Sequence, residues 1–196
     1  MTDIRPLPHV LNIKPYVPGG KLAGAKGHVA MLASNENPFG PSPKAIDAMR
    51  EAAGSVHVYP DPGYGALREA IAGATGIAVS SGSDEIIHLL TQCYAGPGDE
   101  ILQTEHAFSM YAVSAMSHGA TCISVPETDL TAGANAILGG VSERTKILFL
   151  ANPNNPTGTM MTVEALKDLQ DALPPHVLFV IDGAYAEYVG PDYEAA

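Results

Sequence analysis

The segment KILFLANPNNPTGTM (146–160) joins an apolar run to a loop rich in asparagine, proline and glycine. Its first part, KILFLA, shows no polar alternation, which is typical of a parallel strand covered by helices on both faces. Two prolines and a glycine then fix a non-repetitive loop at the carboxyl end of this strand, where α/β proteins bind ligands. The loop therefore predicts a ligand contact, and a tight turn stabilised by asparagine side chains is the equal alternative.

Apolar strands and helices alternate on both sides of this segment. The expected strands cover residues 77–81, 100–104, 121–125, 146–151 and 176–182. The expected helices cover residues 43–52, 65–75, 84–95, 108–119, 129–138 and 162–173. Short buried strands joined by helices predict an α/β fold, a three-layer sandwich with a mostly parallel sheet.

Residues 1–40 differ in character from the rest of the chain, because they hold much proline and glycine without a sustained period. Such a stretch predicts an extended N-terminal arm or lid, which needs another surface to lie on. Residues 41–196 are then expected to form the N-terminal part of a larger domain.

Composition excludes several classes of protein. The 196 residues are 46% hydrophobic and 16% charged, a globular composition, and the formal net charge is -11. An acidic chain is a poor match for nucleic acid or for an anionic membrane surface. The start of the chain has no apolar signal region, so a soluble cytoplasmic protein is expected. The seven histidines show no metal-ligand spacing, so no metal site is expected.

A second informative segment is VSSGSDEIIHLL (79–90), in which a short strand leads into a helix. Gly82 allows close approach of the backbone, and Ser83 is expected to cap the helix. The free N–H groups of Ser83 and Asp84 at the helix start predict an anion site, for example for a phosphate. An ordinary strand-to-helix turn with a good cap is the alternative.

A third segment is HVLFVIDGAYAEY (176–188), which places Asp182 at the end of an apolar strand. An ionised carboxylate there is costly unless it is paired, and a protonated heteroaromatic nitrogen would be a suitable partner. Tyr185 brings a phenol to the same edge. The alternative is that Asp182 caps the next helix.

Together these segments resemble the fold-type I, aspartate-aminotransferase-like pyridoxal-phosphate enzymes, and among them the histidinol-phosphate aminotransferases. The stretches that carry the resemblance are LASNENPFGPSP (32–43), HVYPDPGYGALREAIA (57–72), SSGSDEIIHLL (80–90), EHAFSMY (105–111), NPNNPTGT (152–159) and IDGAYAEY (181–188). The resemblance implies a homodimer that uses pyridoxal 5'-phosphate to transaminate histidinol phosphate with 2-oxoglutarate, a step of histidine biosynthesis.

The resemblance also implies roles for residues around the cofactor. Ser83 and Asp84 would hold its phosphate through backbone N–H groups, and Phe108 would stack on its ring. Asp182 would pair with the ring nitrogen. The two residues that would hydrogen-bond the phenolic oxygen of the ring are Asn155 and Tyr185.

Further implied roles concern the partner subunit and the substrate. Tyr59 would reach the cofactor phosphate of the neighbouring subunit. Tyr16, Asn35 and Asn37 would lie on the substrate side.

The lysine that bonds covalently to the cofactor in this family is expected beyond Ala196, together with the C-terminal part of the large domain and a small domain. The 196-residue chain is therefore expected to be inactive alone. One alternative is a catalytically dead fragment, or one complemented by a partner chain. Another is a related threonine-phosphate decarboxylase, which shares these N-terminal motifs.

Overall fold

The computed structural model describes residues 6–14, 34–72 and 80–190. The chain divides into two compact units, and each is described by itself. One, here called the sheet unit, comprises Met1–Ile13 and Ser80–Ala196, and the other, the helical unit, comprises Lys14–Val79. The expected division into an arm over residues 1–40 and a domain over residues 41–196 stays a prediction.

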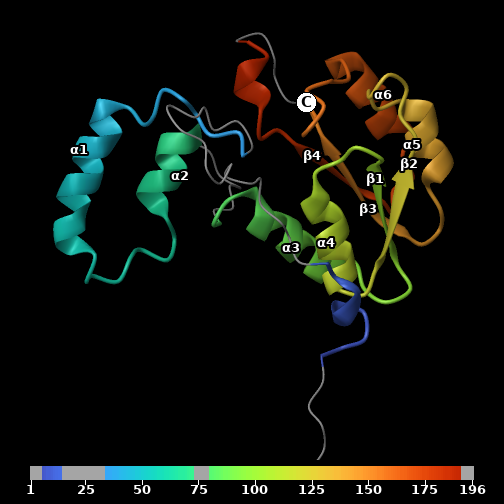
Figure 1. Ribbon diagram of the computed structural model, residues 1–196, viewed down its shortest axis with the longest axis horizontal. Coiled ribbons are helices and arrows are strands. Elements are labelled where there is room, and N and C mark those ends of the chain that lie inside the picture. Colours follow the sequence, from blue (N-terminus) through green and yellow to red (C-terminus); the bar gives the residue numbers. More distant parts are fainter. Residues whose placement is uncertain (1–5, 15–33, 73–79, 191–196) are drawn as a thin grey trace, which may run out of the picture. The chain divides into compact units, whose positions relative to one another are not determined.

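The sheet unit is built on four parallel strands in the order β2-β1-β3-β4 (Figure 1). The strands are β1 (Glu100–Thr104), β2 (Thr121–Val125), β3 (Thr145–Ala151) and β4 (Leu178–Asp182). β1 pairs with both β2 and β3, and β3 pairs with β4, always in parallel. The expected parallel sheet is thereby confirmed. The strand expected over 77–81 lies mostly outside the described residues, and Ser80 and Ser81 are not in a strand.

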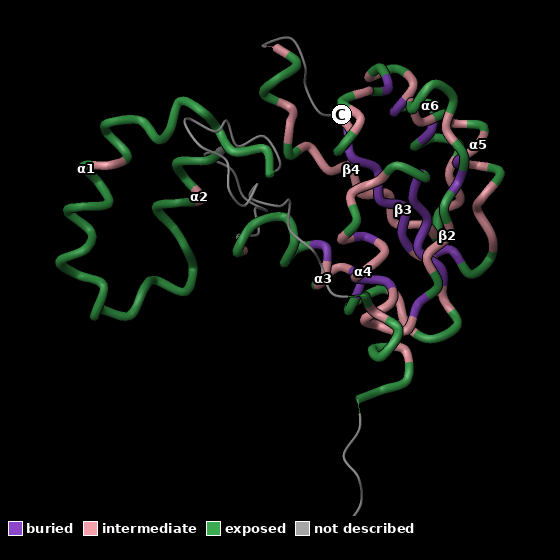
Figure 2. Tube along the Cα trace, viewed as in Figure 1, coloured by how far each residue is buried: buried purple, intermediate pink, exposed green. Residues whose placement is uncertain are grey.

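Two pairs of helices cover the two faces of this sheet, which confirms the three-layer sandwich (Figure 1). The helices α3 (Ser83–Tyr94) and α4 (Ser109–Ser117) cover one face, and α5 (Ala134–Gly140) and α6 (Val163–Ala172) cover the other. Short 3-10 helices, η1 (Val10–Asn12) and η3 (Ala186–Tyr188), complete the unit. Figure 2 shows the buried residues concentrated in the strands and in the helix faces against them.

Neighbouring residues of one strand serve opposite cores, because side chains alternate along a strand. In β3, Ile147 and Phe149 join the core under α3 and α4. Leu148 and Leu150 join the core under α5 and α6. Residues 146–151 are therefore almost wholly apolar because helices cover both faces of β3.

The expected helix over residues 129–138 is wrong in its first half. Asp129 and Leu130 have φ angles of 49° and 60°, in the left-handed region that a helix cannot contain. A bridge between Thr128 and Thr131 closes this turn, and α5 begins only at Ala134. The turn thus takes the residues that the sequence pattern assigned to the helix.

The helical unit contains α1 (Pro43–Ala52), η2 (Ala53–Ser55) and α2 (Gly65–Ala72). The Ser42 side chain caps α1 by accepting from the Ala45 N–H at 3.2 Å, and proline occupies the first turn. None of residues 34–71 is buried (Figure 2). The helix expected over 65–75 is confirmed as far as Ala72, and the rest lies outside the described residues.

The loop before α2 is organised by the Asp61 carboxylate, which accepts from the N–H groups of Gly63 and Gly65 at 2.9 and 3.0 Å. These bonds, that of Gly65 first, lower the pKa of Asp61. The carboxylate thus supplies acceptors at the helix start, where backbone donors lack partners within the helix.

Glu100, at the start of β1, joins the sheet to the turn before β3. Its carboxylate accepts from the Ser142 hydroxyl at 2.5 Å and pairs with Arg144. The Ser142 hydrogen bond is the largest cause of a lowered pKa; burial opposes the shift, and Arg144 supports it. The folded pKa therefore lies below the unfolded value, so the stabilisation is complete above the unfolded pKa and is lost as pH falls through the folded pKa.

We expect the Ser142→Ala variant to lose less stability than the wild type when pH is lowered below about 4.5, because its Glu100 pKa has moved back towards the ordinary value. Urea unfolding at a series of pH values between neutral and acid measures this dependence. Glu143→Gln, which removes an exposed carboxyl from the same turn, should leave the slope unchanged. Equal slopes in Ser142→Ala and the wild type would contradict the assignment.

Candidate cofactor site

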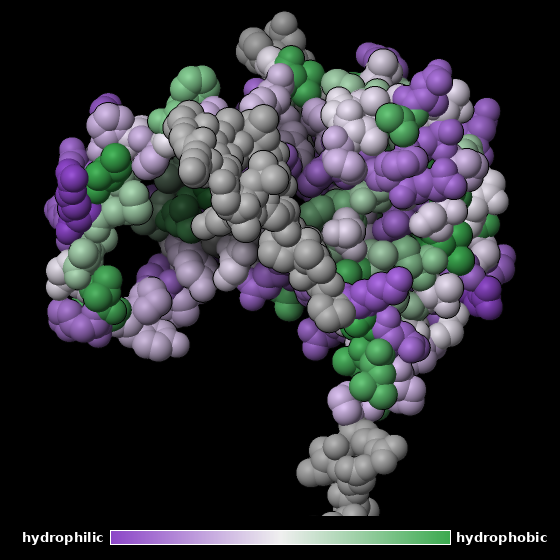
Figure 3. Space-filling view, viewed as in Figure 1, coloured by the Kyte–Doolittle hydropathy of each residue, from purple (hydrophilic) through white to green (hydrophobic). Residues whose placement is uncertain are grey.

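The carboxyl edge of the sheet brings two of the informative segments together. β3 and β4 end in register, with Ala151 paired to Asp182. The Asn152 N–H donates to the Asp182 carbonyl at 3.0 Å, so the loop after β3 and the turn after β4 start side by side. On the face drawn in Figure 3, hydrophilic and hydrophobic side chains intermingle over the sheet unit.

Both carboxylate oxygens of Asp182 accept hydrogen bonds. The Tyr111 hydroxyl donates to Oδ2 at 2.8 Å, and the Ala184 N–H donates to Oδ1 at 3.1 Å. Asp182 does not cap the next helix, since the N-cap residue of η3 is Tyr185. The carboxylate is half-buried and held in place at the mouth of the sheet, and this favours the interpretation as a ligand partner.

Tyr111 is the residue of this site that the sequence argument missed. It is fully buried, lies stacked on Phe149 with ring centroids 4.8 Å apart, and meets Phe108 edge-on at 5.7 Å. Burial, followed by the nearby charge of Asp182, raises the pKa of Tyr111 far above its ordinary value. The phenol therefore remains a proton donor to Asp182. Its position three residues after Phe108, on the same helical side, was the available signal.

Asn155 and Tyr185 meet at the same edge, where the Asn155 amide nitrogen lies 3.3 Å from the Tyr185 hydroxyl. Phe108 is the N-cap residue of α4 and contacts Tyr111, which in turn contacts Asp182. Phe108 and Asp182 are thereby joined through Tyr111. An aromatic face, a carboxylate and an amide–phenol pair are thus available to a flat polar ring.

The loop between β3 and α6, here called the asparagine loop because it carries Asn152, Asn154 and Asn155, is closed at its base by two hydrogen bonds. The Asn152 side chain is buried, and its amide nitrogen donates to the Met161 carbonyl at 3.1 Å. In return the Met161 N–H donates to Asn152 Oδ1 at 2.8 Å. The peptide bonds before Pro153 and Pro156 are cis. Asn155 lies between Asn152 and Met161, so it is carried by a loop whose two ends are bonded to each other.

The start of α3 differs in one respect from the sequence expectation. Its N-cap residue is Gly82, with φ 91°, a conformation that favours glycine, and Ser83 is the first helical residue. The expected capping by Ser83 is wrong, because no side chain caps this helix. Glu85 instead reaches back to accept from the Ser81 N–H at 2.6 Å. Ser83 and Asp84 are exposed at the helix start, as an anion site requires.

The remaining predicted residues lie outside the described part of the sheet unit. Tyr16 lies outside the described residues. Asn35, Asn37 and Tyr59 belong to the helical unit; Asn37 accepts from the Phe39 N–H at 2.9 Å, and Tyr59 is 88% exposed. Their roles stay predictions.

Within residues 6–14, 34–72 and 80–190, no cluster of three or more histidine, cysteine, aspartate or glutamate side chains is arranged to hold a metal ion. In the same ranges, no helix combines the length and apolar character needed to cross a membrane.

The fold and the group of residues at the carboxyl edge of the sheet are typical of one protein family. Residues 28–196 match the family described as aminotransferase class I and II, and the chain belongs to that family. It is 75% identical to histidinol-phosphate aminotransferase of Hyphomonas neptunium and 50% identical to that of Dinoroseobacter shibae. Each alignment covers 100% of this chain and 55% of the relative, so the chain spans about half the length of these relatives.

Solved structures agree with this assignment. Histidinol-phosphate aminotransferase of Sinorhizobium meliloti, in complex with pyridoxal-5'-phosphate, matches with a TM-score of 0.75 and 29% identity, covering 79% of this chain and 44% of the other. A putative histidinol-phosphate aminotransferase of Erwinia carotovora atroseptica matches with a TM-score of 0.74 and 27% identity, covering 81% and 48%.

Proposed function

We propose that the full-length protein containing this sequence catalyses a pyridoxal-phosphate-dependent transamination between histidinol phosphate and 2-oxoglutarate. The observation that carries the proposal is the half-buried Asp182 carboxylate, held by Tyr111 at the carboxyl edge of the sheet. The 75% identity to a histidinol-phosphate aminotransferase supports the choice of substrate.

The residues of the sheet unit fit pyridoxal phosphate. The Asp182 carboxylate suits a protonated ring nitrogen, and Asn155 and Tyr185 suit the phenolic oxygen of the ring. Phe108 offers an aromatic face. The helix start at Ser83, with its free N–H groups and a glycine N-cap, suits the phosphate.

Each of these groups has a task in the proposed reaction. Bound pyridoxal phosphate would supply an electron sink for the amino-bearing carbon of the substrate. Asp182 would pair with the protonated ring nitrogen, and the Tyr111 hydroxyl keeps the Asp182 side chain oriented through its hydrogen bond to Oδ2. Asn155 and Tyr185 fix the ring in its plane by hydrogen bonds to its edge.

The rest of the proposal concerns the whole enzyme. In the proposed enzyme, the lysine that bonds to the cofactor and a small domain lie outside the 196 residues of this sequence. The active form is a cytoplasmic homodimer in which Tyr59 reaches the partner's cofactor. Tyr16, Asn35 and Asn37 contact the substrate, within an arm over residues 1–40.

The experiment combines cofactor titration with a coupled assay on the full-length protein. We expect stoichiometric binding of pyridoxal phosphate, seen as a visible absorption band. We also expect one glutamate to form for each histidinol phosphate consumed. The 196-residue chain assayed alone should show no turnover. Release of carbon dioxide from threonine phosphate, without glutamate formation, would replace the proposal with the decarboxylase.

A further inference from the structure

His106 and Glu127 form a hydrogen-bonded pair at the carboxyl edge of the sheet, outside the groups assigned above. The ring nitrogen Nδ1 of His106 lies 2.9 Å from Glu127 Oε2, and the His106 N–H donates to Glu127 Oε1 at 3.2 Å. The Glu127 side chain is only 2% exposed, whereas that of His106 is 50% exposed. Burying a carboxylate this deeply is costly unless hydrogen bonds satisfy it, and His106 provides two of these bonds.

The ionisation of Glu127 follows from its surroundings. Burial raises its pKa, but hydrogen bonds from Thr104 and from the side chain and N–H of His106 outweigh burial and hold the pKa below the ordinary value. An ionised carboxylate only accepts, so Nδ1 of His106 carries the proton that points to it. Both oxygens of Glu127 therefore hold the turn after β1.

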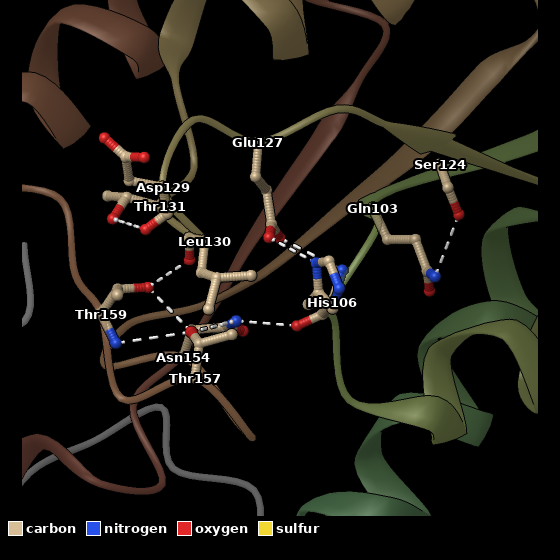
Figure 4. Close-up of polar contacts among 10 residues, drawn as sticks. All are labelled: Gln103, His106, Ser124, Glu127, Asp129, Leu130, Thr131, Asn154, Thr157 and Thr159. Atoms are coloured by element: carbon tan, nitrogen blue, oxygen red, sulfur yellow. Dashed lines mark hydrogen bonds and ion pairs between the residues drawn. The ribbon is translucent and has the colours of Figure 1, made fainter.

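The other side of the same turn is held by the asparagine loop. The amide nitrogen of Asn154 donates to the His106 carbonyl at 2.7 Å and to the Thr157 hydroxyl at 2.9 Å (Figure 4). The backbone N–H, the carbonyl and the ring of His106 are all engaged. His106 is thereby fixed between Glu127, which follows β2, and Asn154, which follows β3.

A third contact closes the set into a ring. The Thr159 hydroxyl donates to the Leu130 carbonyl at 2.6 Å, and it lies 2.8 Å from the Thr157 hydroxyl, which accepts from Asn154 (Figure 4). The three loops after β1, β2 and β3 are thus joined in one closed network, here called the three-loop ring. Its members are His106, Glu127, Leu130, Asn154, Thr157 and Thr159.

Two members of the three-loop ring stand directly beside proposed cofactor contacts. Asn154 precedes Asn155, and His106 lies two residues before Phe108. Movement of the turn after β1 relative to the asparagine loop would separate the stacking face from the amide. A network that fixes both loops to a third therefore fixes the distance between two groups that must contact one ring.

We propose that His106, anchored on Glu127, is a positioning residue that sets Phe108 against Asn155 and so preorganises the cofactor ring site. This inference rests on the proposed function, because it needs a ring to be bound. His106 itself contacts the neighbouring loops and acts through them.

The first test measures how firmly the three-loop ring holds its loops in the absence of cofactor. In cofactor-free full-length protein, we expect His106→Ala to speed amide hydrogen exchange at least about ten-fold in residues 105–108 and 152–159, since the clasp between them is lost. His176→Ala is the matched control, because it removes another histidine of the sheet unit, exposed and 3.2 Å from the Ser142 carbonyl. It should leave exchange in both loops unchanged. Unchanged exchange in His106→Ala would overturn the proposal.

The second test measures the binding of pyridoxal phosphate by the full-length protein. His106→Ala and Glu127→Gln should each weaken pyridoxal-phosphate affinity about ten-fold and alter the circular dichroism of the bound ring. The double variant should be no weaker than either single one, since the two residues act as a pair. His106→Asn, whose amide can replace Nδ1 as the donor, should restore most of the affinity. Far-ultraviolet circular dichroism checks that each variant folds, and His106→Asn keeps the test open if His106→Ala does not.

The outcomes separate the two proposals. If the wild-type protein binds no pyridoxal phosphate, the proposed function fails, and the exchange measurement still decides whether the three-loop ring holds the loops. If the wild type binds the cofactor but His106→Ala raises only the KM for the substrate, His106 contacts substrate directly and the positioning role is overturned. Additive losses in the double variant would overturn the pairing with Glu127.

Discussion

Turnover by the full-length protein should fall at least about 100-fold in the Asp182→Asn variant, the size of effect seen when one preorganised electrostatic contact is removed. The change keeps the shape of the side chain, and its amide oxygen can still accept from the Ala184 N–H, whereas its amide nitrogen would donate to the Tyr111 oxygen. It removes the negative charge at the end of β4 that would keep a ring nitrogen protonated. Without that charge the ring accepts electrons less readily, so the chemical step slows.

Single-turnover kinetics with histidinol phosphate measure this loss separately from substrate binding. Asp168→Asn is the matched control, because Asp168 is exposed on α6 and its change of charge is the same. A second readout is the absorption spectrum of the bound cofactor, which reports the protonation of the ring. Wild-type turnover with an unchanged spectrum in Asp182→Asn would exclude Asp182 as the partner of the ring nitrogen.

The largest loss of stability from a single methyl group is expected for Gly140→Ala. A Cβ atom at Gly140 would lie 2.4 Å from Val125 Cγ1 and 3.0 Å from Leu102 Cδ1. Both neighbours are buried in the core between the sheet and α5, so neither has free space to move into. We expect a loss of about 2–3 kcal/mol in the free energy of unfolding, as for an overpacked core.

Gly139→Ala is the matched control, because it makes the same change one residue earlier in α5. An added Cβ there meets nothing within 4 Å, and the variant should gain about 0.5–1 kcal/mol, because alanine favours a helix more than glycine does. Urea unfolding of both variants measures the difference. Equal stabilities would mean that α5 packs against β1 and β2 less closely than the structure shows.

The sheet could be predicted from the sequence because its strands are short and bounded by turn residues, and because the segments of β3 and β4 are almost wholly apolar. β1 and β2 begin and end at the residues that the pattern predicted, Glu100–Thr104 and Thr121–Val125. The start of α5 could not be predicted in this way. Residues 129–138 contain enough helix-forming residues to suggest a helix, but Asp129 and Leu130 adopt left-handed backbone angles. The contacts that select this turn, such as that of Thr159 with Leu130, come from distant parts of the chain.

In the candidate cofactor site, too, some residues could be predicted from the sequence and others could not. Asp182 and Asn155 were predicted because each follows an apolar strand, and parallel strands bring their carboxyl ends to one edge. Tyr111 was missed because it lies inside a helix whose residues are mostly apolar, where a buried tyrosine reads as packing. The partnership of His106 with Glu127 joins residues 21 positions apart, and no local pattern connects them. Pairs of this kind follow from the order of the strands, which the sequence alone did not provide.

The reciprocal hydrogen bonds between Asn152 and Met161 close the loop between β3 and α6 at its base. The two ends, nine positions apart, are tied to each other and not only to the core. A change at a residue between these ends should therefore leave β3 and α6 in place, although Asn154 and Thr159 are also bonded to the loops after β1 and β2. The base of the loop can thus stay closed when Asn155 is substituted, which separates the contacts of Asn155 from the stability of the sheet.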